Sequence, residues 1–209
     1  MIDRSILTIN TPATSFALTT KEAVKLDLGI TGSTDDTLIN TYILACSKQL
    51  ANACNRVFGE EVVSEKFRFS SSKEAVILSR RAVESVTSVI EDDVLLVAAD
   101  YELDKEAGLL YRLDDDEPLT WFATKLVVVY TAGWDLPTEA PEDLAKAAVA
   151  LVKAQYLSKG RDPLIRSENV PGVYEVAYWV GNIPGSEAWP KDIMSAINAY
   201  RDPFVTAGA

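Results

Sequence analysis

The residues that could carry chemistry in this chain are carboxylates, because its 209 residues include no histidine and only two cysteines. Without histidine, the chain lacks the usual general base, the Ser-His and Cys-His nucleophile pairs and the commonest zinc ligand. Cys46 and Cys54 do not have the Cys-x-x-Cys spacing of a metal or redox site. The glycine-rich loops GxxxxGK and GxGxxG, which bind phosphate groups, are also absent. We therefore expect no cofactor and no bound metal.

The densest group of carboxylates is the run Asp114-Asp115-Asp116-Glu117. Such a run could suggest a cation site, but it lacks the alternation and the glycine of a calcium loop, so we favour a solvated turn. A pair of Asp and Glu side chains that meet only in the fold, as in glycosidases, stays open as an alternative. Because nothing in the sequence marks such a pair, we predict no catalytic residues and no enzyme activity.

The acidic charge is concentrated in one region. The net charge is −11, and residues 91–117 contain eleven acids and two bases. A surface of this kind repels phosphate groups, which argues against its binding nucleic acid. The simplest interpretation is a solvated surface that aids solubility.

No segment predicts export or membrane insertion. Residues 1–10 include Asp3 and Arg4 and have no continuous apolar stretch of a signal peptide, and no apolar run approaches membrane-spanning length. We therefore expect a protein that stays in the cytosol where it is made, with no membrane partner. Cys46 and Cys54 fall on the same predicted helix about 12 Å apart along its axis, which is too far for a disulfide.

Helical periodicity near both ends of the chain predicts about four helices. Thr19 and Glu22 have the spacing of a capping box at the start of the first helix. Asp35 and Asp36 would place negative charge at the positive end of the second, and Pro190 would open the last. The predicted helices cover residues 20–28, 35–58, a segment after Pro141 that ends at Gly160, and 190–201.

Between these segments the apolar periodicity changes to two, which is typical of strands. Phe67 and Phe69 alternate with Lys66 and Arg68, while Asp92-Asp93 has turn chemistry. Further predicted strands are Ala75–Leu78, Val83–Ile90, Val94–Val97, Tyr101–Leu103, Leu109–Leu113 and Leu126–Tyr130.

These elements predict an α+β fold, in which a helical core of about four helices carries an inserted antiparallel β-sheet subdomain. The long segment 161–188 is rich in Pro and Gly, and a loop of that length is usually functional or disordered. The predicted parts are an N-terminal arm at 1–18, the helical core at 19–60 and 136–202, the β insertion at 61–135 and a C-terminal tail at 203–209.

Three separated blocks follow one another in the order and spacing of a known family. The first block contains Leu18-Thr19, Glu22-Ala23, Asp35-Asp36 and the segment Arg56 to Gly59. The second, residues 125–144, combines a closing strand, a Gly-Trp turn and a Pro-Glu-Asp-Leu helix start, and the third is the loop at 162–179. Together they resemble the head-tail connector (adaptor) proteins of long-tailed bacteriophages, prophages and gene transfer agents, over roughly two thirds of the chain.

The resemblance implies a virion structural protein at the head-tail junction, assembled in the host cytoplasm. Such a protein forms a ring, typically a dodecamer, beneath the portal protein and joins the DNA-filled capsid to stopper or tail-completion proteins. DNA would pass through the ring without specific binding, and the acidic region could face that channel. The alternative is a bacterial protein-interaction module of unrelated role, and a carboxylate-based hydrolase is the least favoured class.

The candidate partner-binding residues lie in the long loop and near the end of the chain. Large aromatic side chains there are plausible anchors for a protein partner, although core packing is the alternative for each tryptophan. For Trp121 and Trp134 we favour a core position. In related adaptors the C-terminal region commonly reaches the portal, which points here to Ile193–Ala209. The candidates are Val173, Tyr174, Tyr178, Trp179, Trp189, Ile193, Tyr200 and Phe204.

Overall fold

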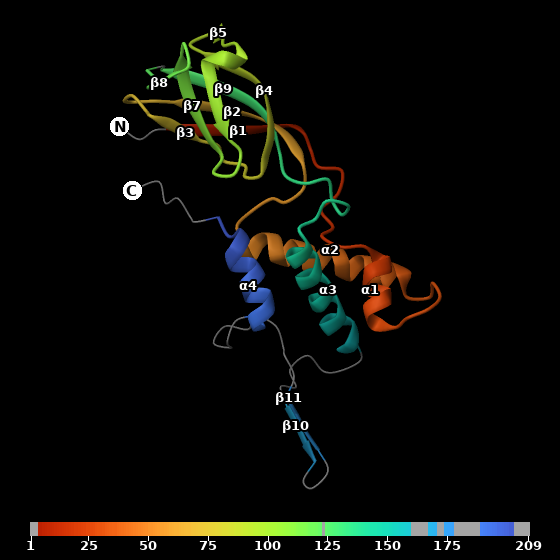
Figure 1. Ribbon diagram of the computed structural model, residues 1–209. Coiled ribbons are helices and arrows are strands. Elements are labelled where there is room, and N and C mark those ends of the chain that lie inside the picture. Colours follow the sequence, from red (N-terminus) through yellow and green to blue (C-terminus); the bar gives the residue numbers. More distant parts are fainter. Residues whose placement is uncertain (1–3, 123, 160–166, 171–173, 178–188, 203–209) are drawn as a thin grey trace. The chain divides into compact units, whose positions relative to one another are not determined.

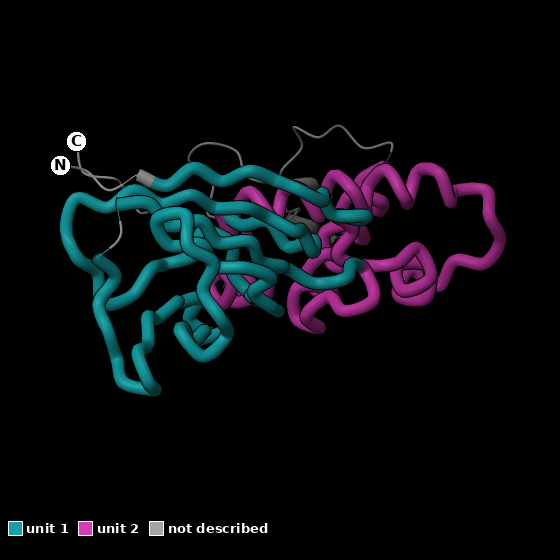
Figure 2. The backbone as a smooth tube through the Cα atoms, turned by 90° about the horizontal axis from the view of Figure 1, so that it is seen from above, with its two compact units in different colours: residues 1–15, 56–136, 203–209 teal, residues 16–55, 137–202 magenta. Residues whose placement is uncertain are grey.

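The chain divides into two compact units, shown in different colours in Figure 2. The β unit holds residues 1–15 and 56–136, and the helical unit holds residues 16–55 and 137–202. The computed structural model describes residues 4–122, 124–159, 167–170, 174–177 and 189–202. Helices and antiparallel strands occur in separate parts of the chain, so the predicted α+β class is confirmed.

The helical unit contains four helices among its described residues (Figure 1). The second and third helices bury the stripes that their periodicity predicts, for example Ile39, Ile43 and Leu50 of the second and Leu144 and Leu151 of the third. The elements are α1 (Lys21–Leu28), α2 (Asp36–Ala53), α3 (Glu142–Leu157) and α4 (Lys191–Tyr200), with an antiparallel hairpin of β10 (Ser167–Val170) and β11 (Tyr174–Ala177).

Two predicted helix boundaries differ from the structure. The cap of α1 is Thr20, whose hydroxyl accepts a hydrogen bond from the Ala23 N–H at 3.2 Å, while Thr19 is buried. The second helix ends at Ala53 rather than at residue 58. Asn55 adopts a positive φ of 51°, and the carbonyl of Phe58 accepts a bond from Trp134 in the β unit. Val57 and Phe58 therefore belong to the β unit, although they continue the helical spacing.

The amino terminus of α2 is tied to two other helices by adjacent carboxylates. Asp36 accepts bonds from Lys21 and Lys25 of α1, both at 2.8 Å. Asp35 accepts bonds from Tyr156 at 2.7 Å and from Lys159 at 3.1 Å, at the end of α3. These donors hold the pKa of both carboxyl groups below its usual value, the Lys21 bond contributing most for Asp36 and the Tyr156 bond most for Asp35.

The β unit contains two antiparallel sheets. One has five strands in the order β1-β2-β9-β4-β5, and the other has the order β3-β7-β6 with β8 paired to β7. Two-residue turns at Asp92-Asp93 and Asp115-Asp116, all with positive φ, join consecutive strands. The strands are β1 (Arg4–Thr11), β2 (Glu61–Arg68), β3 (Ala75–Ile77), β4 (Val83–Glu91), β5 (Val94–Leu95), β6 (Tyr101–Asp104), β7 (Leu109–Asp114), β8 (Glu117–Leu119) and β9 (Lys125–Ala132), with a 3-10 turn at Ala98–Asp100.

The first strand lies in a segment for which the sequence indicated an arm. Residues 4–11 pair antiparallel with β2 from Arg4↔Arg68 to Thr11↔Val62. The strand carries apolar residues on both faces, with Leu7 packed against the core and Ile6 exposed. Because it lacks a clean alternation, its pairing with a strand more than fifty residues later could not be foreseen from local pattern.

Both sheets contribute side chains to one apolar core. One charged residue, Glu65, is buried in the same unit. Glu65 of β2 has no exposed surface, and its carboxyl group accepts bonds from the Tyr130 hydroxyl and the Ser79 N–H, both at 2.9 Å, and from the Ser79 hydroxyl. The Tyr130 oxygen in turn accepts a bond from the Arg80 N–H at 3.1 Å, and Arg80 pairs with Glu61. Burial, followed by the nearby Glu65 charge, raises the pKa of Tyr130.

One close backbone approach in the β unit requires glycine. Gly133 follows β9 with a φ of 110°, and a Cβ atom at this position would lie 2.4 Å from the carbonyl oxygen of Gly59. The approach aligns two backbone bonds, from Trp134 N–H to the Phe58 carbonyl and from Glu60 N–H to the Trp134 carbonyl, each 2.9 Å long.

We expect Gly133→Ala to lower the free energy of unfolding by on the order of 3 kcal/mol, because it adds both backbone strain and a clash with backbone atoms. Gly108→Ala is the matched control in the same unit, since its φ is also positive but its nearest neighbour is the flexible Arg81 side chain. The control should cost about 1 kcal/mol. Denaturant midpoints of the two variants measure the difference, and equal midpoints would contradict the close approach.

The carboxylates at the start of α2 predict a loss of stability in acid. A pKa that is lowered in the folded state stabilises the fold above the ordinary aspartate value and ceases to do so as the pH falls through the lowered value. Asp36→Asn should therefore lower the melting temperature at about pH 6, and the deficit should shrink towards about pH 3. Glu22→Gln is the control, because Glu22 is exposed and its contact with Lys21 is 3.9 Å long. A deficit that is constant with pH would argue against the ion pairs.

Candidate partner-binding surfaces

The carboxylate run at 114–117 forms a tight hairpin turn. Asp114 pairs with Glu117 across β7 and β8, and the two residues between them have φ values of 52° and 68°. All four side chains are exposed, as the solvated-turn interpretation predicts. Within the described ranges, no group of three or more Cys, Asp or Glu side chains is arranged to hold a metal ion, and no helix is long and apolar enough to cross a membrane.

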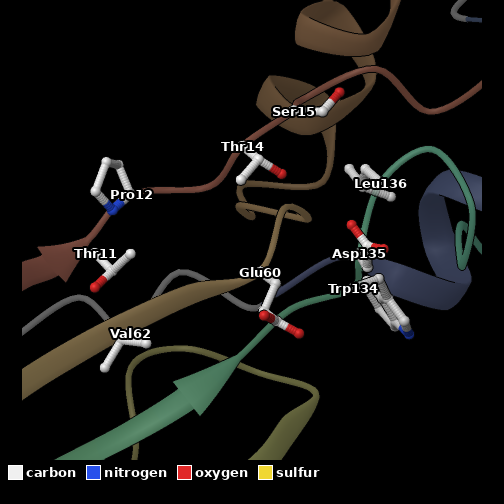
Figure 3. A pocket seen from close by; sticks show the side chains of 9 residues that line it. All are labelled: Thr11, Pro12, Thr14, Ser15, Glu60, Val62, Trp134, Asp135 and Leu136. Atoms are coloured by element: carbon white, nitrogen blue, oxygen red, sulfur yellow. The ribbon is translucent and has the colours of Figure 1, made fainter.

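A small hollow lies on the β unit where the chain leaves β1 (Figure 3). It has a volume of about 140 Å³ and is lined on one side by Glu60, Trp134 and Asp135 and on the other by Thr11 and Pro12. Pockets for small ligands usually have volumes of about 300–1,000 Å³. The hollow is therefore too small for a substrate site, although it holds two carboxylates.

Trp134 and Trp121, for which the sequence favoured core positions, have different surroundings. Trp121 has no exposed surface, and its indole N–H donates to the Leu110 carbonyl at 3.1 Å. Trp134 is half-buried, with the Arg56 guanidinium 4.9 Å from its ring centre and Phe58 beside it. A cation over an aromatic face stabilises the turn after Gly133.

The acidic region and the residues just after it also carry exposed apolar side chains, which the sequence pattern did not indicate. Asp92 anchors the turn after β4 by accepting bonds from Thr124 and Lys125, and the Thr124 hydroxyl contributes most to the lowered pKa of Asp92. The strand after this turn, β5, has only two residues, and both of its side chains are exposed. The exposed residues are Val94, Leu95, Val97, Leu119 and Phe122.

The candidates near α4 belong largely to the helical unit itself. Ile193 is 4% exposed and Ile197 has no exposed surface, so both are buried residues of α4. The Tyr200 hydroxyl donates to Asp143 of α3 at 3.0 Å, and Trp189 is half-buried just before the helix. A partner can reach Ile193 only if α4 leaves this core.

The remaining candidates are less completely placed. Tyr174 is the first residue of β11, where its backbone pairs with Val170. Val173, Tyr178, Trp179 and Phe204 lie outside the residues that the structure describes. The partner-binding role of the eight candidates therefore stays a prediction.

The fold is similar to chains of three solved particle structures. Over 97% of this chain and 98% of the other, it matches a chain in the neck of an empty GTA particle computed with C6 symmetry, at 19% identity and a TM-score of 0.58. With the same coverage, the chain matches a chain in the neck of the native GTA particle computed with C12 symmetry, at 18% identity and a TM-score of 0.52. It also matches a chain in the virion of a native gene transfer agent (GTA) particle, at 20% identity and a TM-score of 0.56. At these identities the likeness establishes the fold. None of the curated proteins compared with this chain matches it.

The sequence itself matches the profile of one protein family. The match runs from residue 17 to residue 201 and so includes all four helices and every strand except β1. A match over this much of the chain covers both units rather than one shared motif. The chain therefore belongs to the head completion protein family.

Proposed function

We propose that this protein is a non-enzymatic structural component of the head-tail junction of a virion or gene transfer particle. In the proposal it forms a ring under the portal protein, joins the DNA-filled capsid to stopper or tail-completion proteins and lets DNA pass through the ring. The observation that carries the proposal is the family match over residues 17–201. The fold likeness to neck chains of gene transfer particles, one computed with C12 symmetry, supports a ring of twelve copies.

The surfaces of the β unit fit a scaffold role. The hollow beside Trp134 is small, and the acidic turns are built from backbone geometry that requires no ligand. A strongly acidic surface keeps DNA from adhering, because phosphate groups and carboxylates repel each other. We therefore assign residues 91–117, with eleven acids and two bases, to a part of the ring that faces the DNA path.

Attachment to the portal is assigned to the C-terminal region, Ile193–Ala209. Within it, Ile193 and Ile197 are engaged in the helical core. Arg201 donates to the Ala53 carbonyl at 3.2 Å and the Asp202 N–H donates to the Cys54 carbonyl at 2.9 Å, so the end of α4 is fixed on the end of α2. A fixed α4 would present the residues that follow it to the portal from a constant position.

Particles produced without this chain should have DNA-filled heads that lack tails. The reason is that the proposed ring joins a capsid that is already filled with DNA. Without the ring, the portal has no platform to which the tail can attach. Electron microscopy and DNA content of purified particles measure the result, and expression of the wild-type chain should restore tailed particles. Normal yields of tailed particles without the chain would overturn the proposal.

The free protein should sediment as a monomer at micromolar concentration, because a net charge of −11 opposes the approach of identical copies. Raising the salt concentration from about 0.05 M to about 0.5 M should increase any weak association, since the Debye length shortens from roughly 14 Å to 4 Å. Analytical ultracentrifugation across this range provides the measurement. A stable dimer at every salt concentration would contradict the expectation that charge repulsion keeps free copies apart.

A further inference from the structure

The strand β1 has an open backbone edge. It lies at the end of the five-stranded sheet with β2 on one side, and among the described residues no strand pairs with its other side. Alternate residues of an edge strand direct their N–H and C=O groups away from the sheet. Over Arg4–Ile9 the register with β2 is regular, so this edge has no bulge for six residues.

The other described sheet edges in the β unit are protected, whereas β1 is not. Natural sheets protect edges by short strands, charged residues or proline. β5 has two residues and β3 has three, while the four-residue β6 carries Glu102 and Asp104. Between Ser5 and Thr11, β1 has neither a charged residue nor proline, and Ile6 is 55% exposed. An edge of this kind favours pairing with another strand.

The β10–β11 hairpin in the helical unit also lacks a neighbouring strand among the described residues. β10 and β11 pair with each other, and no third strand joins them in the described part of the chain. A two-stranded hairpin is only marginally stable alone in water. The sequence around β11, VYEVAYWV, is rich in the β-branched and aromatic residues that favour strands.

Charge also matches the hairpin to β1. Lys66 and Arg68 of β2 are exposed and stand in register beside Ile6 and Arg4 of β1. The eight strand residues of the hairpin include Glu168 and Glu175 and no base. In a chain of net charge −11, this basic corner of the sheet is a suitable place for an acidic strand of another copy.

We propose that β11 of one copy adds to the open edge of β1 in the next copy, so that main-chain hydrogen bonds link neighbours around the ring. The inference rests on the proposed ring. Strand addition of this kind gains affinity from the backbone and is insensitive to most side-chain changes. Because two different surfaces meet, the contact is heterologous, and repeated rotation can close it into a ring.

Cysteine cross-linking in assembled particles tests the contact directly. Cys46 and Cys54 are buried, and burial raises the pKa of Cys46 to about 11, so the native thiols should stay unreactive. Ile6→Cys combined with Glu175→Cys should give a ladder of covalent oligomers with a short bis-maleimide. Ile6→Cys combined with Glu22→Cys, an exposed position on α1, is the control and should give no ladder.

A pair of proline substitutions tests the edge itself. The amides of Ser5 and Ile6 point to opposite sides of β1, so one of the two variants disrupts pairing with β2 and the other affects only the open edge. Ser5→Pro and Ile6→Pro should therefore differ: one melts at a lower temperature, and the other melts like the wild type but yields tailed particles reduced on the order of tenfold or more.

The outcomes separate this inference from the proposed function. If the chain is present in particles but the cysteine pair gives no ladder and the stable proline variant assembles normally, the strand addition is refuted and the ring stands. A cross-link between the two cysteines of a single copy in the free monomer would mean that β11, or another segment of the same chain, lies at the edge of β1. That result would also refute strand addition between copies. If particles contain no copy of the chain, the proposed function itself fails. Binding of DNA fragments to the free protein that Lys66→Gln abolishes, without a ladder in particles, would assign the basic corner to nucleic acid instead.

Discussion

The β unit depends on hydrogen bonds to one buried carboxyl group, that of Glu65, which has no access to water. Glu65 lies in the middle of β2, between Leu7 of β1 and Val128 of β9 in register. A buried carboxyl group without donors costs several kcal/mol, so the fold forms only when Ser79 and Tyr130 supply hydrogen bonds. Ser79 lies between β3 and β4, which belong to different sheets. The same bonds that satisfy Glu65 therefore hold the link between the two sheets in place.

How far the sequence predicted the fold depends on whether the signal was local. Helix α3 begins after Pro141 with Glu142 and Asp143 in its first turn, and the pattern predicted this start because caps and dipoles act within one turn. The glutamate at 65 offered no such signal, since an acid in an alternating strand normally faces water. Its burial depends on Tyr130, 65 residues later, and on Ser79. Long-range pairing of this kind cannot be derived from periodicity.

The same distinction applies to the candidate site residues. Ile193 and Tyr200 are candidates because the resemblance places the C-terminal region at the portal. Within the helical unit, however, Ile193 is buried and the Tyr200 hydroxyl bonds to Asp143. The exposed apolar side chains near Asp92 were missed because Val94–Val97 has the composition of a buried strand. Their exposure follows from the topology, in which β5 is a two-residue edge.

The structure also indicates which kinds of contact this protein can offer to neighbours without losing stability. The apolar faces of α2, α3 and α4 are used inside the helical unit, and both sheets share one core in the β unit. Contacts with other proteins can then use surfaces that the two cores leave unused, which include strand edges, turns and exposed helix residues such as Leu26, Leu44 and Leu157. Backbone edges are suited to such a chain, because main-chain hydrogen bonds between strands require no charged side chains. Acidic turns can meanwhile keep the remaining surfaces of identical copies apart, because like charges repel.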